Sequence, residues 1–513
     1  SFMREIKNKK NLNLKKLLKK ISIIKKNKKK IGLCHGVFDL LHPGHITYLN
    51  EAKSLCDYLV VSITKDEFVN KGPGRPFFDI EKRKTLVSNL SSVDYVVESN
   101  FETAEKIIKD IKPDLYVKGP DYKKIKNDLT NNINKEIKAI ISVKGKFITT
   151  GGNIYSSSKF INSSFSIFSE KQKNLIDLVK KKHSFLDIKN FFNKLKKKKV
   201  LVVGETIVDQ YSFCEALGKS GKESVLAFRK KKEINYAGGA VAVANNLSSF
   251  SNRVNLISYL GEKKEYLNFF LKQKPKNCKY NFIYKSNTPT IVKKRYIDEI
   301  SNSKLIGIYE IKDNLVNKKE TEKIKNYLNK ELKNNEIVIV ADYGHGLISK
   351  NIANTLCKKS KYISLNAQTN AANAGYHSIN KYNSLNCLVI NETELRYELR
   401  NKDEPIEKLI KELSKTKIAH FIIVTRGRNG SILLDKNKDK LYFCPAFETN
   451  PIDKIGAGDT LLYMFSIVFY ISKCPILSLF LSSLAAANNV KFFANSEKMN
   501  DSNFLKLISH VLK

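Results

Sequence analysis

Short apolar segments alternate with amphipathic segments of helical length along most of the chain. In the first third, apolar runs typical of strands lie at 31–39, 58–64, 94–99 and 113–119. Strands separated by helix-length segments favour a parallel, doubly wound sheet. The same alternation begins again at 200–209 and continues toward the C-terminus. The pattern therefore predicts an α/β protein with two doubly wound parallel-sheet domains.

Four segments follow from this pattern. Residues 1–30 are predicted to form a basic N-terminal helix, and residues 31–164 the first α/β domain. Residues 165–198 are lysine-rich with little sign of a core and are predicted to be a helical linker, and residues 199–513 form the second domain. The leucine stripe of the first helix would also suit a membrane surface, but packing on the first domain is favoured.

Composition supports a globular protein in a reducing compartment. The 513 residues are 42% hydrophobic and 10% aromatic, enough for two or three domains with their own cores. The eight cysteines are scattered with no CxxC pair, which argues against a zinc site or a disulfide framework. The most apolar stretch, 461–472, is about one core helix long. We expect a cytoplasmic protein with no membrane span and no signal peptide.

The net charge of +41 raises the question of nucleic-acid binding. Only 10 of the 91 basic residues are arginine, the side chain best suited to bidentate recognition of phosphates and guanine. Solvated lysine faces that attract anionic substrates are therefore favoured, and no specific nucleic-acid partner is expected. A basic protein that binds RNA or an anionic membrane remains the alternative from another functional class.

The string GVFDLLHPGH at residues 36–45 indicates a strand that ends in a glycine turn and leads into a helix. Free backbone N–H groups and the helix dipole at such a helix start favour a triphosphate. His42 and His45 lie three residues apart there, so both imidazoles can reach one phosphate. This chemistry suits nucleotidyl transfer, in which an acceptor oxygen attacks the α-phosphate and pyrophosphate leaves.

The context GxFDxLHxGH resembles the cytidylyltransferase-like family of nucleotidylyltransferases, and the resemblance covers residues 31–164. Within it, the CxGVFD start and the DLxVKGxDY string are most similar to the nucleotidylyltransferase half of bifunctional heptose kinase/adenylyltransferases. Class I aminoacyl-tRNA synthetases also carry HxGH, but the chain offers no candidate for their KMSKS-like loop or anticodon-binding parts. The resemblance implies a nucleotidylyltransferase fold and activity.

The resemblance assigns roles position by position. His42 and His45 would be catalytic. Nucleotide binding would fall to Gly36, Phe38, Asp39, Gly44, Lys118, Ser156, Ser157, Ser158 and Lys159. Sugar-phosphate binding would fall to Arg75, Arg83 and Asp121. Lys71 either approaches the triphosphate or is a solvated lysine, and His35 is interpreted as a buried turn residue.

The string DKIGAGDT at residues 453–460 is the most informative one in the second domain. Its glycines leave backbone N–H groups open at a helix start, which forms an anion hole for a phosphoryl group in transfer. Asp459 follows directly and can take the proton from an attacking sugar hydroxyl. The sequence therefore predicts a phosphoryl-transfer site here.

This segment resembles the second signature of the ribokinase-like PfkB carbohydrate kinases, and the resemblance covers residues 200 to about 495. It implies that Asp459 is catalytic and that Glu394 acts indirectly on Mg²⁺. Sugar binding would fall to Asp209, Gly238, Gly239 and Arg295. The ATP site and anion hole would comprise Asn391, Glu394, Thr425, Gly427, Gly456, Ala457 and Gly458.

Three departures from the kinase pattern concern the sugar side more than the ATP side. Glu205 stands where the family has Asp, Ala242 where an asparagine is expected, and Asn366 where many relatives have Asp. These changes put a heptose 7-phosphate substrate in doubt and leave the activity of the kinase open. The domain order is also the reverse of that in the heptose enzymes.

Together the two sites predict a bifunctional, sugar-activating enzyme. An ATP-dependent kinase would supply a sugar phosphate, and transfer from CTP or ATP with Mg²⁺ would give an NDP-sugar, such as an NDP-heptose for surface glycans. The partners expected are nucleoside triphosphates and sugar phosphates, and a homodimer is possible. The alternative enzyme hypothesis keeps only nucleotidyl transfer, with the kinase fold as a sugar sensor.

Overall fold

The computed structural model divides the chain into two compact units. One comprises Ser1–Glu170 with Ser502–Lys513, and the other Lys171–Asp501. The residues that the structure describes are 10–122, 132–151, 168–220, 224–369, 373, 378–416, 418–448 and 450–512. Each unit is described by itself below.

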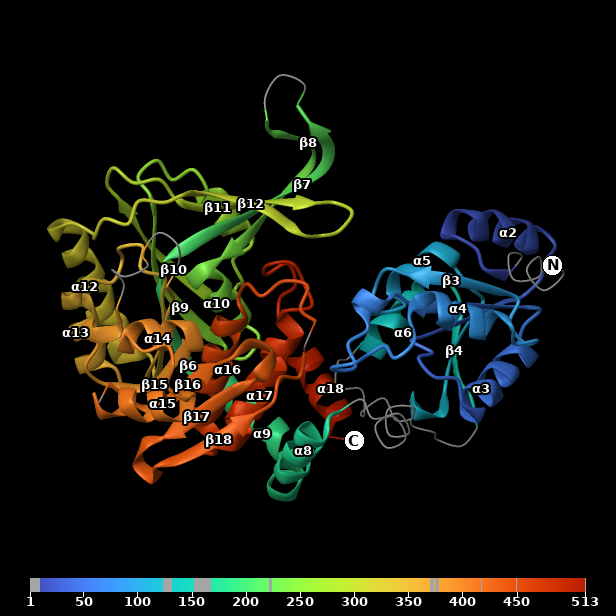
Figure 1. The fold of residues 1–513 in the computed structure, drawn as a ribbon. Helices are drawn as coiled ribbons and strands as arrows, with labels where there is room; N and C mark the ends of the chain where they lie inside the picture. Colours follow the sequence, from blue (N-terminus) through green and yellow to red (C-terminus); the bar gives the residue numbers. More distant parts are fainter. Residues whose placement is uncertain are drawn as a thin grey trace. The chain divides into compact units, whose positions relative to one another are not determined.

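The first unit alternates strands with helices, as the blue and cyan parts of Figure 1 show. Its helices are α2 (Leu14–Lys26), α3 (Pro43–Ser54), α4 (Ile80–Ser88), α5 (Glu105–Ile111), α6 (Asn132–Ser142) and, at the end of the chain, α18 (Asp501–Val511), with the 3-10 turns η1 (Asp66–Phe68) and η2 (Pro120–Tyr122). Its strands are β1 (Ile31–Gly36), β2 (Tyr58–Thr64), β3 (Tyr95–Ser99), β4 (Leu115–Lys118) and β5 (Lys146–Thr149).

Within the described residues these strands form one parallel five-stranded sheet in the order β3-β2-β1-β4-β5. Both faces of the sheet carry apolar side chains, because neighbouring residues of a strand point to opposite sides. Leu33 belongs to a core cluster with residues of α2, α5 and α6, and Cys34 to another with residues of α3. The sheet is therefore doubly wound, as predicted.

The basic N-terminal helix is part of this unit. Leu17, Ile21 and Ile24 of α2 are buried in the same cluster as Ile31 at the start of β1. The side chain of Asn13 caps the helix by accepting a hydrogen bond of 2.9 Å from the backbone N–H of Lys16. Because the apolar stripe faces the sheet, packing on the first domain explains it without a membrane surface.

The second unit is larger and follows the same alternation. Its helices are α8 (Glu170–Lys182), α9 (Phe185–Lys196), α10 (Gly239–Leu247), α11 (Leu267–Lys272), α12 (Lys318–Asn334), α13 (Lys350–Lys359), α14 (Glu392–Leu399), α15 (Ile406–Lys415), α16 (Ala457–Ser472) and α17 (Pro475–Asn489), with the 3-10 turns η4 (Ile379–Lys381), η5 (Gly427–Asn429) and η6 (Lys436–Lys438). Its main-sheet strands are β6 (Lys199–Gly204), β9 (Arg253–Gly261), β10 (Cys278–Lys285), β13 (Ile337–Asp342), β14 (Ile363–Ala367), β15 (Leu385–Asn391), β16 (Ala419–Thr425), β17 (Ser431–Asp435) and β18 (Lys440–Cys444).

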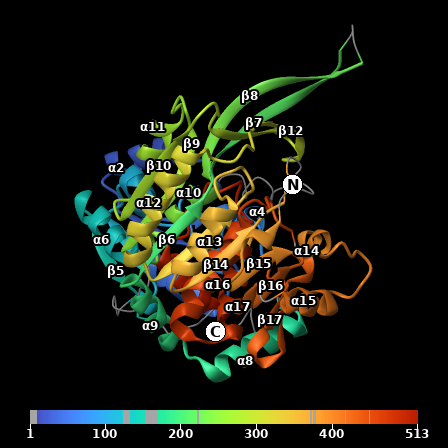
Figure 2. The same ribbon diagram turned by 90° about the vertical axis from the view of Figure 1, so that its left-hand side faces the viewer.

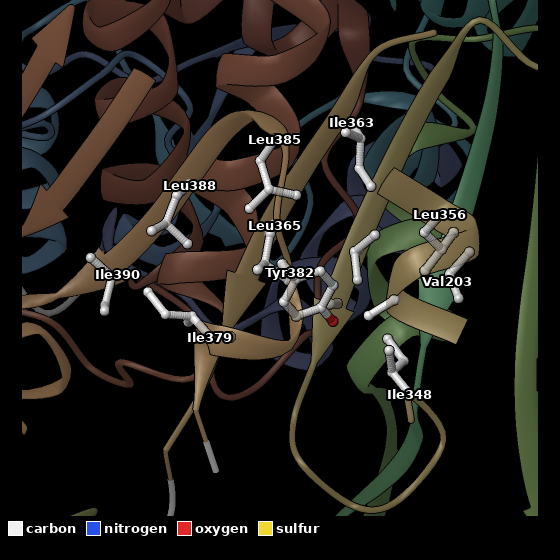
Figure 3. Packing of buried hydrophobic residues seen from close by; sticks show 14 of the residues in the cluster. Val203, Ile348, Leu356, Ile363, Leu365, Ile379, Tyr382, Leu385, Leu388 and Ile390 are labelled. Carbon is white, nitrogen blue, oxygen red and sulfur yellow. The ribbon is translucent and has the colours of Figure 1, made fainter. Parts of the chain in front are cut away.

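In the described part of this unit the main sheet has nine strands, in the order β10-β9-β6-β13-β14-β15-β16-β17-β18. Pairing is parallel from β10 to β16 and antiparallel from there to β18. Figure 3 shows side chains such as Leu365, Leu385 and Tyr382 packed together in its core. No helix in the described ranges is both long and apolar enough to cross a membrane.

A second sheet in this unit was not predicted. It contains β7 (Thr206–Lys219), β8 (Leu226–Gly238), β11 (Ile291–Asp298) and β12 (Lys304–Glu310), in the order β12-β11-β7-β8. Figure 2 shows the β7–β8 hairpin extending away from the main sheet. The apolar run at 200–209, with which the second domain was predicted to begin, is divided at Glu205 between β6 of the main sheet and β7 of this one.

The unit boundaries differ from the predicted ones at two places. Residues 171–198, expected to be a linker, group with the second unit. There α9 buries Ile188, Phe192 and Leu195, and the ring of Phe192 lies 5.5 Å from that of Phe250. Residues 502–513, expected in the second domain, group with the first unit.

Candidate active sites

The first candidate site lies at the carboxyl end of β1. This strand has β2 on one side and β4 on the other, so the order of the strands reverses beside it. In open parallel sheets, ligands bind at the carboxyl ends of the strands at such a reversal. The sequence after β1 leads directly into α3, whose N-cap is His42 and whose first residue is Pro43.

The two predicted catalytic histidines lie together at this helix start. The rings of His42 and His45 stack with centroids 4.0 Å apart, and the backbone N–H of His45 donates to the carbonyl of His42 at 2.8 Å. Burial, together with the charges of His42 and Lys71, lowers the pKa of His45 to about 3. His45 is therefore neutral near pH 7 and can donate one ring N–H to a phosphate oxygen.

Gly36 and Phe38 shape the turn before the histidines. Phe38 has a φ of +50°, and its ring centroid lies 5.5 Å from that of His45. A Cβ on Gly36 would lie 3.2 Å from the Phe38 ring, which requires a shift of the ring. Gly44 lies in the first turn of α3. Gly36 and the ring of Phe38 thus bring the backbone of the turn close to the histidine pair.

Asp39 and Arg75, assigned to nucleotide and sugar phosphate respectively, are bound to each other. Arg75 Nη1 lies 3.0 Å from Asp39 Oδ2, and their side chains are only 4% and 1% exposed. The other oxygen, Oδ1, accepts hydrogen bonds of 2.6 and 3.0 Å from the backbone N–H groups of Phe77 and Phe78. In this arrangement the pair holds the loop after Arg75 against the turn after β1.

The prediction that Arg83 contacts the sugar phosphate is not supported, because its side chain is fully buried. Its guanidinium donates to the carbonyls of Phe78 at 2.9 Å, Val37 at 2.6 Å and Thr64 at 2.8 Å, and it pairs with Asp66. These partners belong to three separate loops around the end of β1. Arg83 therefore connects the loops around the end of β1 to one another.

Lys118, at the end of β4, has a buried acidic partner that the sequence did not indicate. Its Nζ lies 3.4 Å from Glu136 Oε2 of α6 and donates to the carbonyl of His35 at 3.3 Å. Burial lowers the pKa of Lys118, but Glu136 and Tyr122 raise it more, so the net shift is upward. The ammonium thus stays charged. His35 is buried as expected, with Nδ1 3.2 Å from Ser62 Oγ.

Five assigned positions of the first site receive no side-chain description. Ser156, Ser157, Ser158 and Lys159 lie outside the described residues. Asp121 falls within η2, and only the course of its backbone is described. Their roles remain predictions from the resemblance.

The second candidate site lies at the carboxyl edge of the main sheet in the second unit. Predicted site residues follow β15 and end β16, while β6 and β13 are neighbours at the point where the strand order reverses. The start of α16 carries the anion-hole segment. The fold therefore gathers the predicted site residues between Asn391 and Asp459 at one edge, as expected for a parallel sheet.

Asp459 is the best-defined group of this site. Its Oδ2 accepts from the Tyr343 hydroxyl at 2.8 Å, and its Oδ1 accepts from the amides of Asn366 at 3.0 Å and Gln368 at 2.9 Å. Burial raises the pKa of Asp459 to about 6, although these donors oppose the shift. The carboxylate is thus oriented by three neutral donors and is ionised at neutral pH, as a general base requires.

The predicted anion hole is the first turn of α16. Gly456, its N-cap, has a φ of +80° and no side-chain cap, and Ala457 and Gly458 begin the helix. The first N–H groups of a helix have no partner within it and favour an anion. A Cβ on Gly458 would lie 3.2 Å from Asn366 Nδ2, beside the donor to Asp459. The phosphoryl-binding turn and the base are therefore adjacent.

The predicted sugar residues lie on the second sheet. Arg295 of β11 donates to Asp209 Oδ1 of β7 at 2.6 Å. Gly238 lets the backbone of β8 approach the carboxylate of Asp209, because a Cβ there would lie 2.1 Å from Asp209 Oδ2. The next residue, Gly239, has a φ of +60°. Lys293, which the sequence analysis did not select, is opposite Asp209 in the strand register. Burial lowers its pKa, and its charge lowers the pKa of Asp459.

The predicted ATP residues are placed at two neighbouring strand ends. Asn391 and Glu394 form a capping box at the start of α14, and Glu394 Oε1 also accepts from the backbone N–H of Thr369 at 3.0 Å. Burial raises the pKa of Glu394, with Asp459 adding to the shift. Thr425 ends β16, and Gly427 has a φ of +55° in the turn that follows.

Two of the three departures have a structural explanation. The fully buried Glu205 accepts from the backbone N–H groups of Tyr343, His345 and Leu347 at 3.0, 3.2 and 3.2 Å, so it holds the segment that carries the Tyr343 hydroxyl. Asn366 donates directly to Asp459. Ala242 is buried within α10, and nothing in the structure explains the replacement of asparagine there.

The described residues of the second site could hold Mg²⁺ together with the phosphates of a bound nucleotide. No group of three or more His, Cys, Asp or Glu side chains among them could hold a metal ion. However, Glu394 and Asp459 are two carboxylates close enough to affect each other's ionisation. Mg²⁺ typically takes one or two carboxylates, waters and substrate phosphates, so this pair fits such an ion.

Two family models match the chain, one over each site. A model described as pfkB family carbohydrate kinase matches residues 197–462, more than half of the chain. A model described as cytidylyltransferase-like matches residues 33–163. The chain therefore belongs to the pfkB family of carbohydrate kinases. It is an enzyme that joins a nucleotidyltransferase domain to a carbohydrate kinase domain.

Curated relatives named Bifunctional protein HldE match the first of these domains. The Bifunctional protein HldE of Pseudomonas savastanoi pv. phaseolicola is 40% identical over 113 residues, which are 22% of this chain and 24% of that protein. The protein of the same name from Actinobacillus succinogenes is 43% identical over 105 residues, which are 20% and 22% of the two chains. The chain thus spans about a quarter of the length of these relatives.

Solved structures that are similar to the chain include two sugar kinases. Ribokinase of Arabidopsis thaliana, in complex with ribose and ATP, has a TM-score of 0.46 and 19% identity, covering 62% of this chain and 99% of that one. Phosphofructokinase-2 of Escherichia coli has a TM-score of 0.48 and 12% identity, covering 62% and 100%.

Proposed function

We propose that the chain activates a sugar in two steps, phosphorylation by ATP and transfer of a nucleotidyl group from CTP or ATP to the sugar phosphate. The observation that carries this proposal is the buried Asp459, held by three neutral donors beside the first turn of α16. The paired histidines at the start of α3 support the second reaction. The product is an NDP-sugar, with surface glycans as its destination and the cytoplasm, where nucleoside triphosphates are available, as the location.

In the kinase step a sugar hydroxyl attacks the γ-phosphorus of ATP. Asp459 accepts the hydroxyl proton, the new O–P bond forms, and the bond to the β-phosphate oxygen breaks to release ADP. The N–H groups of the first turn of α16 stabilise the charge on the transferred group. Asp209 orients the sugar, and Glu394 would help to hold a Mg²⁺ ion that would supply positive charge to the ATP phosphates.

In the transferase step a phosphate oxygen of the sugar phosphate attacks the α-phosphorus of the nucleotide, and pyrophosphate leaves. His42 and His45 sit at a helix N-terminus, where backbone dipoles also favour the phosphates. The partly buried, neutral His45 donates an N–H as charge grows on the transferred group. A sugar phosphorylated at C1 is the acceptor that the kinase step would supply.

The test is a screen of nucleoside triphosphates against sugar phosphates with the intact protein, reading pyrophosphate release. We expect release with one pair of substrates and a loss of about 10²–10³-fold in rate for His45→Ala, since one donor to the transition state is removed. His183→Ala, at the end of α8, is the matched control and should keep the wild-type rate. Equal rates for His45→Ala and the wild type would refute the assignment.

A further inference from the structure

The last helix of the chain contacts the nucleotidyltransferase unit. From Ser502 onward, α18 groups with residues 1–170, although the preceding residues belong to the kinase unit. Its side chains reach two loops of the first unit, one after β3 and one before α4. Neither contact is used by the sites described above.

The first contact is made to Glu102 in the loop after β3. Asn503 Nδ2 donates to Glu102 Oε2 at 2.9 Å, and Lys506 Nζ donates to Oε1 at 3.2 Å. The carbonyl of the same residue lies 3.4 Å from Nε2 of His35. His35 is the last residue but one of β1, next to Gly36, and its carbonyl accepts from Lys118. The helix thus holds a loop that contacts the backbone turn of the site.

The second contact is made to the loop that contains Lys71. Its neighbour Gly72 has a φ of +102°, and a Cβ there would lie 3.2 Å from Val511 Cγ2 and 4.0 Å from Leu507 Cγ. Helix α18 therefore packs against the bare backbone of this loop. The charge of Lys71 lowers the pKa of His45, after burial and His42, so the loop lies close to the histidine pair.

We infer that residues 502–512 are a positioning element for nucleotidyl transfer, which fixes the loops that contain Lys71 and Glu102. The inference rests on the proposed nucleotidyl-transfer function. Nucleotidyl transfer then depends on residues 502–512. The kinase chemistry does not depend on them. Lys506 and Glu102 act through the loops and do not touch the reacting atoms.

A charge swap in the full-length protein tests this inference. Lys506→Glu places two carboxylates together and should raise the KM for the nucleoside triphosphate about fivefold, more than it lowers kcat, since a pair of this kind typically contributes up to about 1 kcal/mol. Glu102→Lys should behave alike, and the double variant should recover most of the loss. Lys106→Glu, an exposed lysine of α5, is the control of equal charge change, and the sugar kinase rate should stay constant in all variants.

Hydrogen exchange separates this inference from the proposed function. In Lys506→Glu the amides of residues 69–74 and 99–104 should exchange faster than in the wild type, and Leu507→Asp should increase exchange at 69–74 most. If the wild type releases no pyrophosphate, the proposed function fails, and the exchange data alone decide the positioning role. Unchanged exchange, or an active wild type whose kinetics Lys506→Glu leaves unaltered, would overturn the inference.

Discussion

At the scale of single residues, the proposed kinase chemistry assigns the proton of the sugar hydroxyl to one carboxylate. Asp459→Asn keeps the size of the side chain and removes its capacity to accept a proton. We expect sugar-dependent ADP formation to fall about 10²–10⁴-fold, the usual contribution of a general base, while pyrophosphate release from a supplied sugar phosphate is unchanged. Asp439→Asn, in an exposed left-handed turn, is the matched control. Full kinase activity in Asp459→Asn would mean that another group takes the proton.

The same carboxylate predicts a pH dependence. Its pKa is raised to about 6 by burial, and only the ionised form accepts a proton, so kcat/KM of the kinase should fall as the pH drops through 6 and level off above it. Asn366→Asp replaces an amide donor by a second carboxylate and should shift this limb to higher pH. A pH–rate profile of both proteins measures the shift, with Asn351→Asp on the surface of α13 as the control.

The sequence predicts which side chains lie together better than it distinguishes contact with a ligand from support of the site. His42 and His45 were predicted to meet because a spacing of three residues at a helix start brings two side chains to one face. Their rings stack in the structure. The support role of Arg83 could not be predicted, because its partners come from loops that only the fold brings together. Tyr343 and Gln368 were missed for the same reason.

At the scale of secondary structure elements, Glu205 connects β6 to the segment after β13. Glu205→Gln should keep the bonds to Oε1 and lose the acceptor for the Tyr343 N–H, leaving a buried donor unpaired. We expect the unfolding free energy of the kinase unit to drop by about 1–3 kcal/mol and kcat to fall about tenfold as Tyr343 shifts from Asp459. Denaturant unfolding and kinase assays measure these effects.

An exposed glutamate provides the comparison for this variant. Glu215→Gln, on β7 and paired with Lys231 at the surface, should change stability by less than about 0.5 kcal/mol. If Glu205→Gln matched this control in both stability and kcat, the proposed support of the Tyr343 segment would be refuted.

Elements with a clear hydrophobic period were predicted, and those defined by distant pairing were not. The strand at 58–64 has the predicted bounds, because its apolar run is buried on both faces. Strand β12, by contrast, is exposed along its whole length, so no alternation marks it as part of a sheet. A helical linker was predicted over 165–198 because its lysines hide short buried stripes such as Ile188, Phe192 and Leu195.

At the scale of the whole molecule, the proposed function makes the product of the kinase unit the substrate of the nucleotidyltransferase unit. With an unphosphorylated sugar, ATP and the second nucleotide, the intact protein should therefore form NDP-sugar. His45→Ala should stop at the sugar phosphate, and Asp459→Asn should work only when sugar phosphate is supplied. A mixture of the two variants should restore the whole conversion, since each supplies the step that the other lacks.

Chromatography of the reaction mixture distinguishes the possible outcomes. Sugar phosphate that accumulates with the wild type and is never converted would show that the two units act on different substrates. NDP-sugar formation by Asp459→Asn from free sugar at the wild-type rate would support the alternative in which the kinase fold only senses sugar. Recovery by the mixture, with neither variant active alone on free sugar, would establish two successive steps and show that the intermediate is released into solution.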